Sequence, residues 1–554
     1  MTNRPGVAGR RAATTRASTS RLTAVLASAA LLAGCSTAAD IASEESSTAT
    51  VAPSSEVAPS SEAPTEPPTN STPPETEPTD SGVPEGFGAG PDGRGIDRFY
   101  DQKVSWTPCE GGDCADVWVP LDYSKPDGDA ITVKAKRDPA DDQANRFGSM
   151  FINPGGPGGS GIDYLQYESF SASVTDVYDV IGFDPRGVAT STPVECLSDE
   201  EVDAYLASEP TPDDASELKE FQRVWDHYTS GCVEQSGPLL GHVSTVEVAR
   251  DLDIMREVVG DDVLTYFGAS YGTYIGATYA GLFPDKVGRM VLDGAVDPLA
   301  DPRDSAINQA VGFETALTAY LEYCVNEGDC PLGDEVDAAR ERLSQLFRDI
   351  DAQPLPTTDG RELTEGLAFL GVITPLYSRD NWDYETQALR QAVAGQGDIL
   401  LLLADAYAER QPDGSYPNNS TEVQLAVNCL DHPQDESLKE IKAGSRDFIE
   451  VAPVFGVAAQ WWPYACSNWP VKPSVEQPDF AAKGAAPILV VGTTRDPATP
   501  YEQAVSLAET LDSGVLLSRD GDGHTAYGAG NTCIDDAVNT YLVEGTPPED
   551  GTEC

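Results

Sequence analysis

The chain has 554 residues, with 91 Asp and Glu against 35 Lys and Arg, which gives a formal net charge of −56 at pH 7. Such acidity argues against a nucleic-acid partner and against electrostatic docking on anionic lipid, because both require a basic surface. The length allows about two to four domains, and the 40% apolar content is typical of a globular protein.

The N-terminal residues have the pattern of an export signal. Several arginines precede an apolar stretch over residues 22–32, which is too short to span a bilayer as a permanent helix and is typical of a signal peptide. The stretch ends in Leu32-Ala33-Gly34-Cys35, which resembles the processing site of bacterial lipoproteins, where the cysteine is lipidated and becomes the mature N-terminus. We expect a lipoprotein signal peptide over residues 1–35 and a protein anchored through Cys35 to the outer face of the cell membrane. The alternative is an ordinary secretory signal with an unrelated cysteine.

The next segment, residues 36–95, has the composition of a tether. Up to residue 93 it contains no Lys or Arg and only one aromatic residue, Phe87, and it is rich in Pro, Ser, Thr and Glu. Such a segment cannot bury a core, so we expect a disordered acidic linker. Its root-mean-square reach would be roughly 40 Å. A linker of this kind would hold the folded part away from the membrane.

The cysteines indicate disulfides. Apart from Cys35 their number is even, which in an exported chain is typical of a disulfide framework. Pairing of sequential neighbours is our hypothesis, because each closed loop is then short and local. The pairs would be Cys109–Cys114, Cys196–Cys232, Cys324–Cys330, Cys429–Cys466 and Cys533–Cys554. The four histidines show no metal-ligand spacing with these cysteines, so we expect neither a metal nor a cofactor.

Short β-rich runs alternate with helical segments from about residue 96 onward. Residues 117–119 and 131–133 flank a turn-rich segment and predict an antiparallel hairpin. An amphipathic helix is expected over residues 247–259. Further strands are expected at residues 150–152, 177–183, 263–267, 287–292 and 488–491. A hairpin followed by β-α-β units predicts an α/β fold, with a mostly parallel sheet covered by helices on both faces.

Residues 299–483 interrupt this alternation with a largely helical segment, for example at residues 306–324 and 335–351. Insertions at the carboxyl ends of strands commonly build substrate pockets. We therefore predict a core formed by residues 96–298 and 484–554, with a helical cap over the active site between them. The alternative is an independent second domain without a catalytic role.

The pentapeptide Gly268-Ala269-Ser270-Tyr271-Gly272 follows a predicted strand and precedes a predicted helix, residues 273–283. A strand–turn–helix of the form G-x-S-x-G is the nucleophile elbow of α/β-hydrolases. Glycines flank the serine because the backbone there is strained and its neighbours approach closely. Ser270 is thus the predicted nucleophile of an acyl-transfer reaction to water.

A serine nucleophile needs a base and an acid, which follow it along the chain in this fold. His524 lies in a glycine-rich loop after the predicted strand at residues 514–517, and Asp496 follows the strand that begins at residue 488. We predict that these two residues complete the triad. Asp297 is a rival acid, since it also follows a strand.

Other titratable residues near this pattern are assigned different roles. Asp520 and Asp522 are explained better by turn chemistry in the loop of His524. The remaining histidines are His432 within the predicted cap and His227 and His242 before the serine, the latter two expected to be surface or structural.

An oxyanion intermediate needs two backbone N–H donors. The N–H of Tyr271 is one candidate. The glycine-rich loop at residues 153–161 follows a predicted strand directly and offers the other, from Gly155 or Gly156. A phosphate-binding loop is excluded because no Gly-Lys-Ser/Thr follows.

Taken together, these motifs resemble a known family. The segments at residues 153–161, 182–187, 268–273 and 289–294, with the late Asp496 and His524, are similar to the prolyl/tripeptidyl aminopeptidase branch of α/β-hydrolases. The likeness is greatest to secreted or lipid-anchored bacterial members with a TAP-like C-terminal region. It implies an α/β-hydrolase core with a helical cap, a Ser270–Asp496–His524 triad and cleavage of short peptides from peptide N-termini. Asp184 and Arg186 would be structural in that family.

An aminopeptidase must bind a free ammonium group, usually with cap carboxylates, and Asp431 beside Cys429 is the candidate. The leading hypothesis is a cell-envelope serine peptidase that removes di- or tripeptides and has peptides as its partners. One alternative is a carboxylesterase or lipase acting on envelope lipids or esters. The other is a non-catalytic lipoprotein that binds peptides.

Overall fold

The computed structural model describes residues 86–554. The predicted signal peptide, the lipidation site Cys35 and most of the predicted linker lie outside these residues. The folded part begins earlier than residue 96, because the short strand β1 (Phe87–Gly88) pairs antiparallel with β4. In the part of the chain that the structure describes, no helix is long and apolar enough to cross a membrane.

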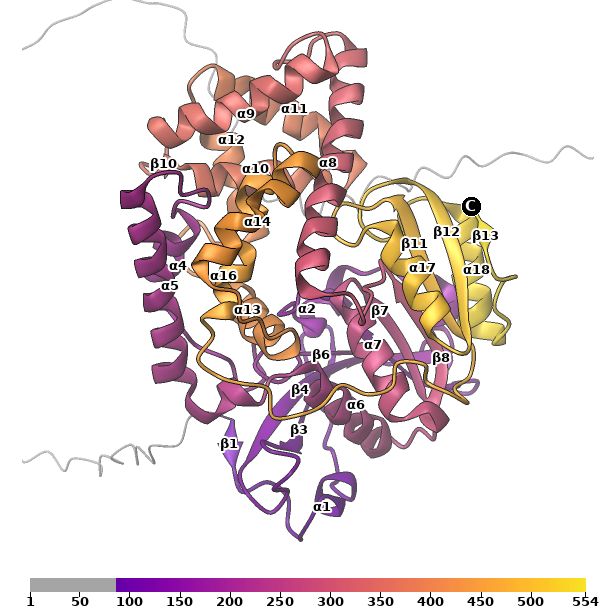
Figure 1. Cartoon of the computed structure of the whole chain (residues 1–554). Helices are drawn as coiled ribbons and strands as arrows, with labels where there is room; N and C mark the ends of the chain where they lie inside the picture. The colour runs from indigo at the N-terminus through magenta and orange to yellow at the C-terminus, as the bar shows by residue number, and fades with distance from the viewer. Residues whose placement is uncertain (1–85) are drawn as a thin grey trace, which may run out of the picture. The chain divides into compact units, whose positions relative to one another are not determined.

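One large mixed sheet runs through the molecule, in the strand order β13-β12-β11-β8-β7-β5-β6-β4-β3-β2 (Figure 1). The strands before the serine are β2 (Thr107–Cys109), β3 (Gly112–Pro120), β4 (Ala130–Asp138), β5 (Gly148–Asn153), β6 (Tyr178–Phe183) and β7 (Leu264–Ala269). Those after it are β8 (Val287–Asp293), β11 (Ile488–Arg495), β12 (Gly514–Asp522) and β13 (Thr552–Glu553).

The sheet is antiparallel at its N-terminal end and parallel elsewhere. β3 and β4 form the predicted hairpin, with Val117 opposite Val133. β5, β6, β7, β8, β11 and β12 run parallel to one another. The carboxyl ends of β7, β8 and β11 therefore meet at one edge of the sheet, which is where α/β folds carry their sites.

Helices cover both faces of the sheet because successive strand side chains point to opposite faces. Phe151 packs into the cluster that contains α6 (Thr245–Val259), α7 (Tyr271–Leu282) and α17 (Tyr501–Thr510). Its neighbours Met150 and Ile152 pack into the opposite cluster. That second cluster contains α2 (Gly161–Tyr167), α3 (Ala172–Thr175) and α18 (Thr532–Glu544). The architecture is the predicted α/β-hydrolase fold.

Between β8 and β11 the chain forms a series of helices, and those within residues 302–407 build most of a hydrophobic core that is separate from the clusters on the sheet. The helices of the series are α8 (Pro302–Glu327), α9 (Val336–Ala352), α10 (Glu365–Leu376), α11 (Trp382–Val393), α12 (Asp398–Tyr407), α13 (Ser420–Asp431), α14 (Leu438–Val451), α15 (Gly456–Ala459) and α16 (Trp462–Ser467), with the small hairpin β9 (Leu355–Pro356) and β10 (Glu362–Leu363). We call this set the helical insertion. Figure 1 shows α9, α11 and α12 as its part farthest from the sheet.

Local sequence signals define both ends of the first helix of the insertion. Asp301 caps α8 by accepting from the backbone N–H groups of Arg303 and Asp304, and Pro302 occupies the first turn. Gly328 ends the helix in a left-handed conformation. Before the insertion the chain also forms α1 (Asp97–Tyr100), α4 (Asp199–Leu206) and α5 (Ala215–Ser236), and Phe99 of α1 and Tyr228 of α5 pack into the same cluster as Phe151.

The structure joins the ten cysteines in the five sequential pairs that the sequence predicts. The bridge between Cys429 and Cys466 connects α13 with α16. The bridge between Cys533 and Cys554 fixes the last residue to the start of α18.

Candidate active site

Ser270 occupies a strained turn between β7 and α7. Its backbone has φ 55° and ψ −128°, a conformation that costs a non-glycine residue about 1–3 kcal/mol. A Cβ atom on Gly268 would lie 2.4 Å from the carbonyl oxygen of Gly272, and one on Gly272 would lie 2.7 Å from that of Asn153. The motif therefore needs its glycines for close packing, and the turn presents Ser270 at the carboxyl edge of the sheet.

His524 and Asp496 form a hydrogen-bonded pair at the same edge. Nδ1 of His524 lies 2.8 and 2.9 Å from the two carboxylate oxygens of Asp496. The buried carboxylate also accepts from the backbone N–H groups of Ala498 and Thr499 at 2.9 Å and of Thr525 at 3.2 Å. These bonds hold Asp496 in one orientation and leave Nε2 of His524 as the free imidazole nitrogen.

The pKa of His524 reflects two opposed effects. Burial lowers the pKa of the imidazole, but the charge and hydrogen bond of Asp496 raise it by more, so that it lies above its ordinary value. The end of β8 lies between this pair and the serine turn. A Cβ atom on Gly294 would lie 3.2 Å from Cε1 of His524, while the preceding carbonyl, of Asp293, accepts from the N–H of Ser270 at 2.8 Å.

The glycine-rich loop after β5 packs directly on the serine turn. A Cβ atom on Gly155 would lie 2.7 Å from Cβ of Ser270 and 2.8 Å from the backbone nitrogen of Tyr271, so only glycine fits there. The N–H of Gly155 donates to the side chain of Asn153 at 3.0 Å. Gly156, by contrast, lines the cavity beside Ser270 and Tyr271. Of the two predicted glycine donors, Gly156 is thus the better placed to receive a ligand oxygen.

Two buried charged residues beside this loop have structural contacts, as the family likeness implies. Asp184 accepts from the hydroxyl of Ser160 at 2.6 Å and so fixes the end of the glycine loop. Arg186 is fully buried and binds both carboxylate oxygens of Asp251 at 2.6 Å. The ion pair also receives support from backbone carbonyls, which satisfies the buried guanidinium.

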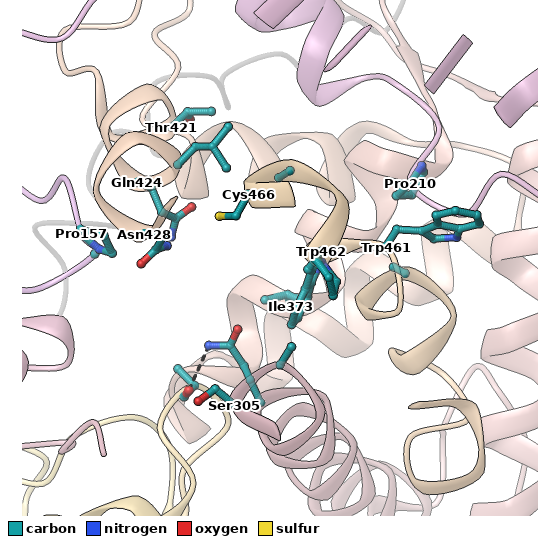
Figure 2. Close-up of a pocket in the computed structure, with 18 of the residues that line it drawn as sticks. Pro157, Pro210, Ser305, Ile373, Thr421, Gln424, Asn428, Trp461, Trp462 and Cys466 are labelled. Carbon is teal, nitrogen blue, oxygen red and sulfur yellow. Dashed lines mark hydrogen bonds between the residues drawn. The ribbon is translucent and has the colours of Figure 1, made fainter. Parts of the chain in front are cut away.

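A cavity of about 580 Å³ lies over Ser270 and is walled largely by the helical insertion. This volume is within the range typical of small-molecule sites. Figure 2 shows Gln424 and Asn428 of α13 and the rings of Trp461 and Trp462 among its lining side chains. Other aromatic lining residues are Tyr205, Phe221, Trp225, Tyr271, Tyr274, Phe313, Phe369, Tyr377, Tyr407 and Phe455. The wall is mostly apolar.

The charges in the cavity are all negative. Glu209 and Asp297 are its carboxylates, and no Lys or Arg is among the described residues that line it. Carboxylate oxygens of Glu209, Asp351 and Glu365 lie within 4.8 Å of one another. Burial, then the nearby Glu209, raises the pKa of Glu365 to about 9, and burial and Glu209 likewise raise that of Asp351 to about 6. A cation entering here would meet a cluster of carboxyl groups with no basic side chain among the described residues of the lining.

Asp431 does not occupy the place that its predicted role requires. Its side chain is buried, and its oxygens accept from the backbone N–H of Thr245 at 3.0 Å and from the hydroxyl of Thr245 at 2.5 Å. It is not among the residues that line the cavity. Burial raises its pKa to about 7. The carboxylate anchors α13 to the start of α6, so this position argues against ammonium binding by Asp431.

The rival acids have other partners. Asp297 lines the cavity and accepts from the hydroxyl of Ser506 at 2.7 Å. Asp520 and Asp522 pair with Arg495 at 2.9 and 2.6 Å. Asp496 is the carboxylate that contacts the imidazole in the described residues.

The other histidines lie elsewhere. His432 stacks on Tyr274 at the cavity wall, and burial lowers its pKa. His227 contacts Glu201 at the surface, and His242 contacts the buried Glu247.

Reasoning from the sequence missed two residues that touch the loop of His524. The carboxylate of Asp293 accepts from backbone N–H groups of that loop. The carbonyl of Tyr377, in the helical insertion, accepts from the N–H of His524 at 2.9 Å, and its ring meets the imidazole edge-on. Asp293 directly follows the strand predicted at residues 287–292, at the same sheet edge as Ser270, a position that could have identified it. No local pattern marks Tyr377.

Comparison with known proteins agrees with this geometry. A family model described as TAP-like protein matches residues 452–554, which include Asp496 and His524. Serine protease Hip1 of Mycobacterium tuberculosis is 40% identical over 478 residues, covering 82% of this chain and 91% of that protein. Carboxylesterase B of the same species is 38% identical over 453 residues, covering 80% and 86%.

A Streptomyces lividans protein, tripeptidyl aminopeptidase, is 32% identical over 469 residues, covering 83% of this chain and 86% of that protein. With such coverage the likeness spans the sheet, the helical insertion and the C-terminal region together. The chain therefore belongs to the α/β-hydrolases with a TAP-like C-terminal region, a family of serine hydrolases.

Proposed function

We propose that the protein is a serine peptidase of the cell envelope that removes short peptides, of two or three residues, from peptide N-termini. The observation that carries this proposal is the cavity over Ser270, which has an apolar aromatic wall, carboxylates and no basic residue among its described lining. A peptide N-terminus combines an ammonium group with side chains that are often apolar, and it fits such a cavity. Two of the relatives, a serine protease and a tripeptidyl aminopeptidase, support peptide cleavage.

The reaction follows from the positions of three side chains. Oγ of Ser270 attacks the scissile carbonyl carbon, and Nε2 of His524 accepts the hydroxyl proton, since Nδ1 is bound to Asp496. The backbone N–H groups of Gly156 and Tyr271 receive the negative oxygen of the tetrahedral intermediate. His524 then donates its proton to the leaving amine, and water releases the acyl group by the same steps in reverse order.

The ammonium group of the substrate would bind at Glu209. This carboxylate lines the cavity and lies beside Asp351 and Glu365. An arriving cation stabilises the ionised forms of all three groups, whose mutual repulsion it relieves. Recognition of the free N-terminus at a fixed place in the cavity would define how many residues lie between the ammonium group and Ser270.

The test compares kcat/KM for a peptide amide with a free and with an acetylated N-terminus. Wild-type enzyme should cleave the free peptide at least about 100-fold better, because acetylation removes the positive charge that would pair with Glu209. Glu209→Gln should reduce this preference mainly through KM, while Asp349→Asn, an exposed carboxylate on α9, should leave it unchanged. Equal cleavage of the acetylated peptide would reject the exopeptidase assignment.

An esterase acting on envelope lipids or other esters is the second candidate. The apolar wall of the cavity and the likeness to carboxylesterase B favour it. Ratios of kcat/KM on aminoacyl amides and on long-chain acyl esters separate the two candidates; activated p-nitrophenyl esters do not, because peptidases of this mechanism also cleave them. Failure of a fluorophosphonate to label wild-type protein more than Ser270→Ala would favour a third possibility, a peptide-binding lipoprotein without catalysis.

The location is also part of the proposal. The apolar stretch and the Leu32-Ala33-Gly34-Cys35 sequence support export and lipidation of Cys35. Cys35→Ala should move the protein from the detergent phase to the aqueous phase in detergent partitioning of expressing cells. Wild-type protein found in the aqueous phase would reject the anchor and leave the enzymatic proposal untouched.

A further inference from the structure

We propose that Asp293 is a positioning residue that holds the loop of His524 in register with the serine turn. This inference rests on the proposed function, since it takes Ser270, His524 and Asp496 as the reacting groups. Asp293 is the last residue of β8, and its side chain is 1% exposed.

Asp293 bonds to both halves of the site at once. Its carboxylate accepts from the N–H of Ala526, 3.0 Å from either oxygen, and from the N–H of Tyr527 at 2.8 Å. Its backbone carbonyl accepts from the N–H of Ser270 at 2.8 Å. The base loop and the nucleophile turn, which are far apart in the sequence, are therefore both fixed to one residue.

The strand order explains why this position is suited to the task. β8 lies between β7, which precedes Ser270, and β11, which precedes Asp496. β8 supplies no member of the triad, but its carboxyl end lies between the carboxyl ends of β7 and β11, which are followed by Ser270 and Asp496. The next residue, Gly294, donates to the carbonyl of Val491 at 3.0 Å and leaves room for the imidazole. A shift of about 1 Å in such a loop can cost about 100-fold in rate.

Asp293 also affects the site through its charge. Burial is the main reason that the pKa of Asp293 is raised to about 6, and the charge of Asp496 raises this pKa further. The backbone N–H groups of Tyr527 and Ala526 and the charge of His524 act in the opposite direction and lower the pKa of Asp293. The other titratable groups facing it are Glu168 and Tyr164, from the end of α2. The negative charge of the Asp293 carboxylate raises the pKa of His524. A neutral replacement should therefore lower the pKa of the base.

This electrostatic effect distinguishes positioning of the base from a general structural role. Asp293→Asn keeps the shape of the side chain but loses its charge and one acceptor. The matched control is Asp179→Asn. Asp179 is also buried and accepts from a backbone N–H, that of Ala140 at 2.9 Å, but its partners lie outside the site. Both variants remove a buried carboxylate, but only the carboxylate of Asp293 acts on the pKa of His524.

The experiment measures kcat, KM and the pH dependence of kcat/KM on an activated ester, with the folded fraction fixed from thermal unfolding. For Asp293→Asn we expect kcat to fall about 10- to 100-fold with little change in KM, and the acid limb of kcat/KM to move to lower pH. Asp179→Asn should keep the wild-type acid limb. The inference would be overturned if Asp293→Asn had the kcat and the acid limb of wild-type enzyme. It would also be overturned if the loss of kcat were fully accounted for by a smaller fraction of folded protein.

If Asp293→Asn does not fold, Asp293→Glu replaces it. This variant keeps the charge but moves the carboxylate by one methylene group, so kcat should fall while the acid limb stays in place; wild-type kcat would overturn the inference. Fluorophosphonate labelling distinguishes failure of the proposed function from failure of the role proposed for Asp293. Wild-type protein that is not labelled at Ser270 contradicts the proposed function, whereas labelled wild-type protein with an Asp293→Asn variant of equal labelling rate contradicts only the role of Asp293.

Discussion

At the residue scale, the Asp496 carboxylate determines which nitrogen of His524 faces the substrate. It binds Nδ1 at 2.8 Å and is itself held by three backbone N–H groups. The tautomer with a proton on Nδ1 is thereby favoured, and Nε2 can accept a proton from Ser270. The function of the acid is thus to orient and stabilise the base.

Replacing Asp496 by Asn should therefore reduce kcat by about 10⁴-fold, because the amide favours the wrong tautomer. In wild-type enzyme kcat/KM should decline as the pH falls through the pKa of His524, which lies above its ordinary value. Steady-state kinetics between pH 5 and pH 9 measures both effects. An Asp496→Asn variant with more than a tenth of wild-type kcat would contradict this role.

Glu365 should make the fold less stable at alkaline pH. Its folded-state pKa is raised by burial and by Glu209 to about 9, above the ordinary value of an unfolded glutamate. The protonated form is therefore favoured in the folded state, and stability from this group decreases as pH rises from the unfolded pKa to the folded pKa.

Glu365→Gln, which mimics the protonated acid, should raise Tm at pH 8 by several degrees and leave Tm at pH 4 unchanged. Thermal unfolding at both values measures the difference. Equal Tm values for wild-type and variant protein at pH 8 would show that Glu365 titrates normally in the folded state.

At the element scale, the disulfide between Cys429 and Cys466 connects two helices of the cavity wall, α13 and α16. It closes a sequence separation of 37 residues, and loop-closure entropy gives a contribution of about 4 kcal/mol for such a bridge. Because α13 also carries Gln424 and Asn428 into the cavity, the bridge fixes the shape of the pocket as well as the fold.

The double variant Cys429→Ser/Cys466→Ser should therefore lower Tm and raise KM for peptides more than for a small activated ester. The matched control is Cys109→Ser/Cys114→Ser, whose bridge spans 5 residues next to the β2–β3 turn and contributes about 2 kcal/mol in the same model. A change in peptide KM of the same size in both double variants would mean that the α13–α16 bridge has no special effect on the cavity.

Much of this arrangement could be predicted from the sequence, because its signals are local. The strand before Ser270, the glycines around it and the order of Asp496 and His524 are patterns within short segments. The position of the Asp431 side chain could not be predicted in this way, because its partner Thr245 is 186 residues away in α6. Asp293 was missed for the same reason, as its carboxylate binds backbone groups more than 230 residues farther along. The two-residue strand β1 is too short for any periodicity and is defined only by its pairing with β4.

At the scale of the whole molecule, the chain has a formal net charge of −56, and its cavity has carboxylates and no basic residue among the described lining residues. Acidic peptides should therefore be poor substrates, because approach and binding are both opposed. Placing Glu instead of Gln within the first two residues of a peptide should lower kcat/KM about 10-fold or more, and added salt should narrow the difference by screening. Equal turnover of the two peptides at low salt would contradict this electrostatic preference.

The most direct test of the proposed function is mass spectrometry of the products from one peptide, supplied with a free or an acetylated N-terminus, after incubation with wild-type enzyme or with Ser270→Ala. We predict that wild-type enzyme releases di- or tripeptides from the free peptide alone and that Ser270→Ala releases none. Internal cleavage of the acetylated peptide at an equal rate, or product formation by Ser270→Ala, would contradict the proposal.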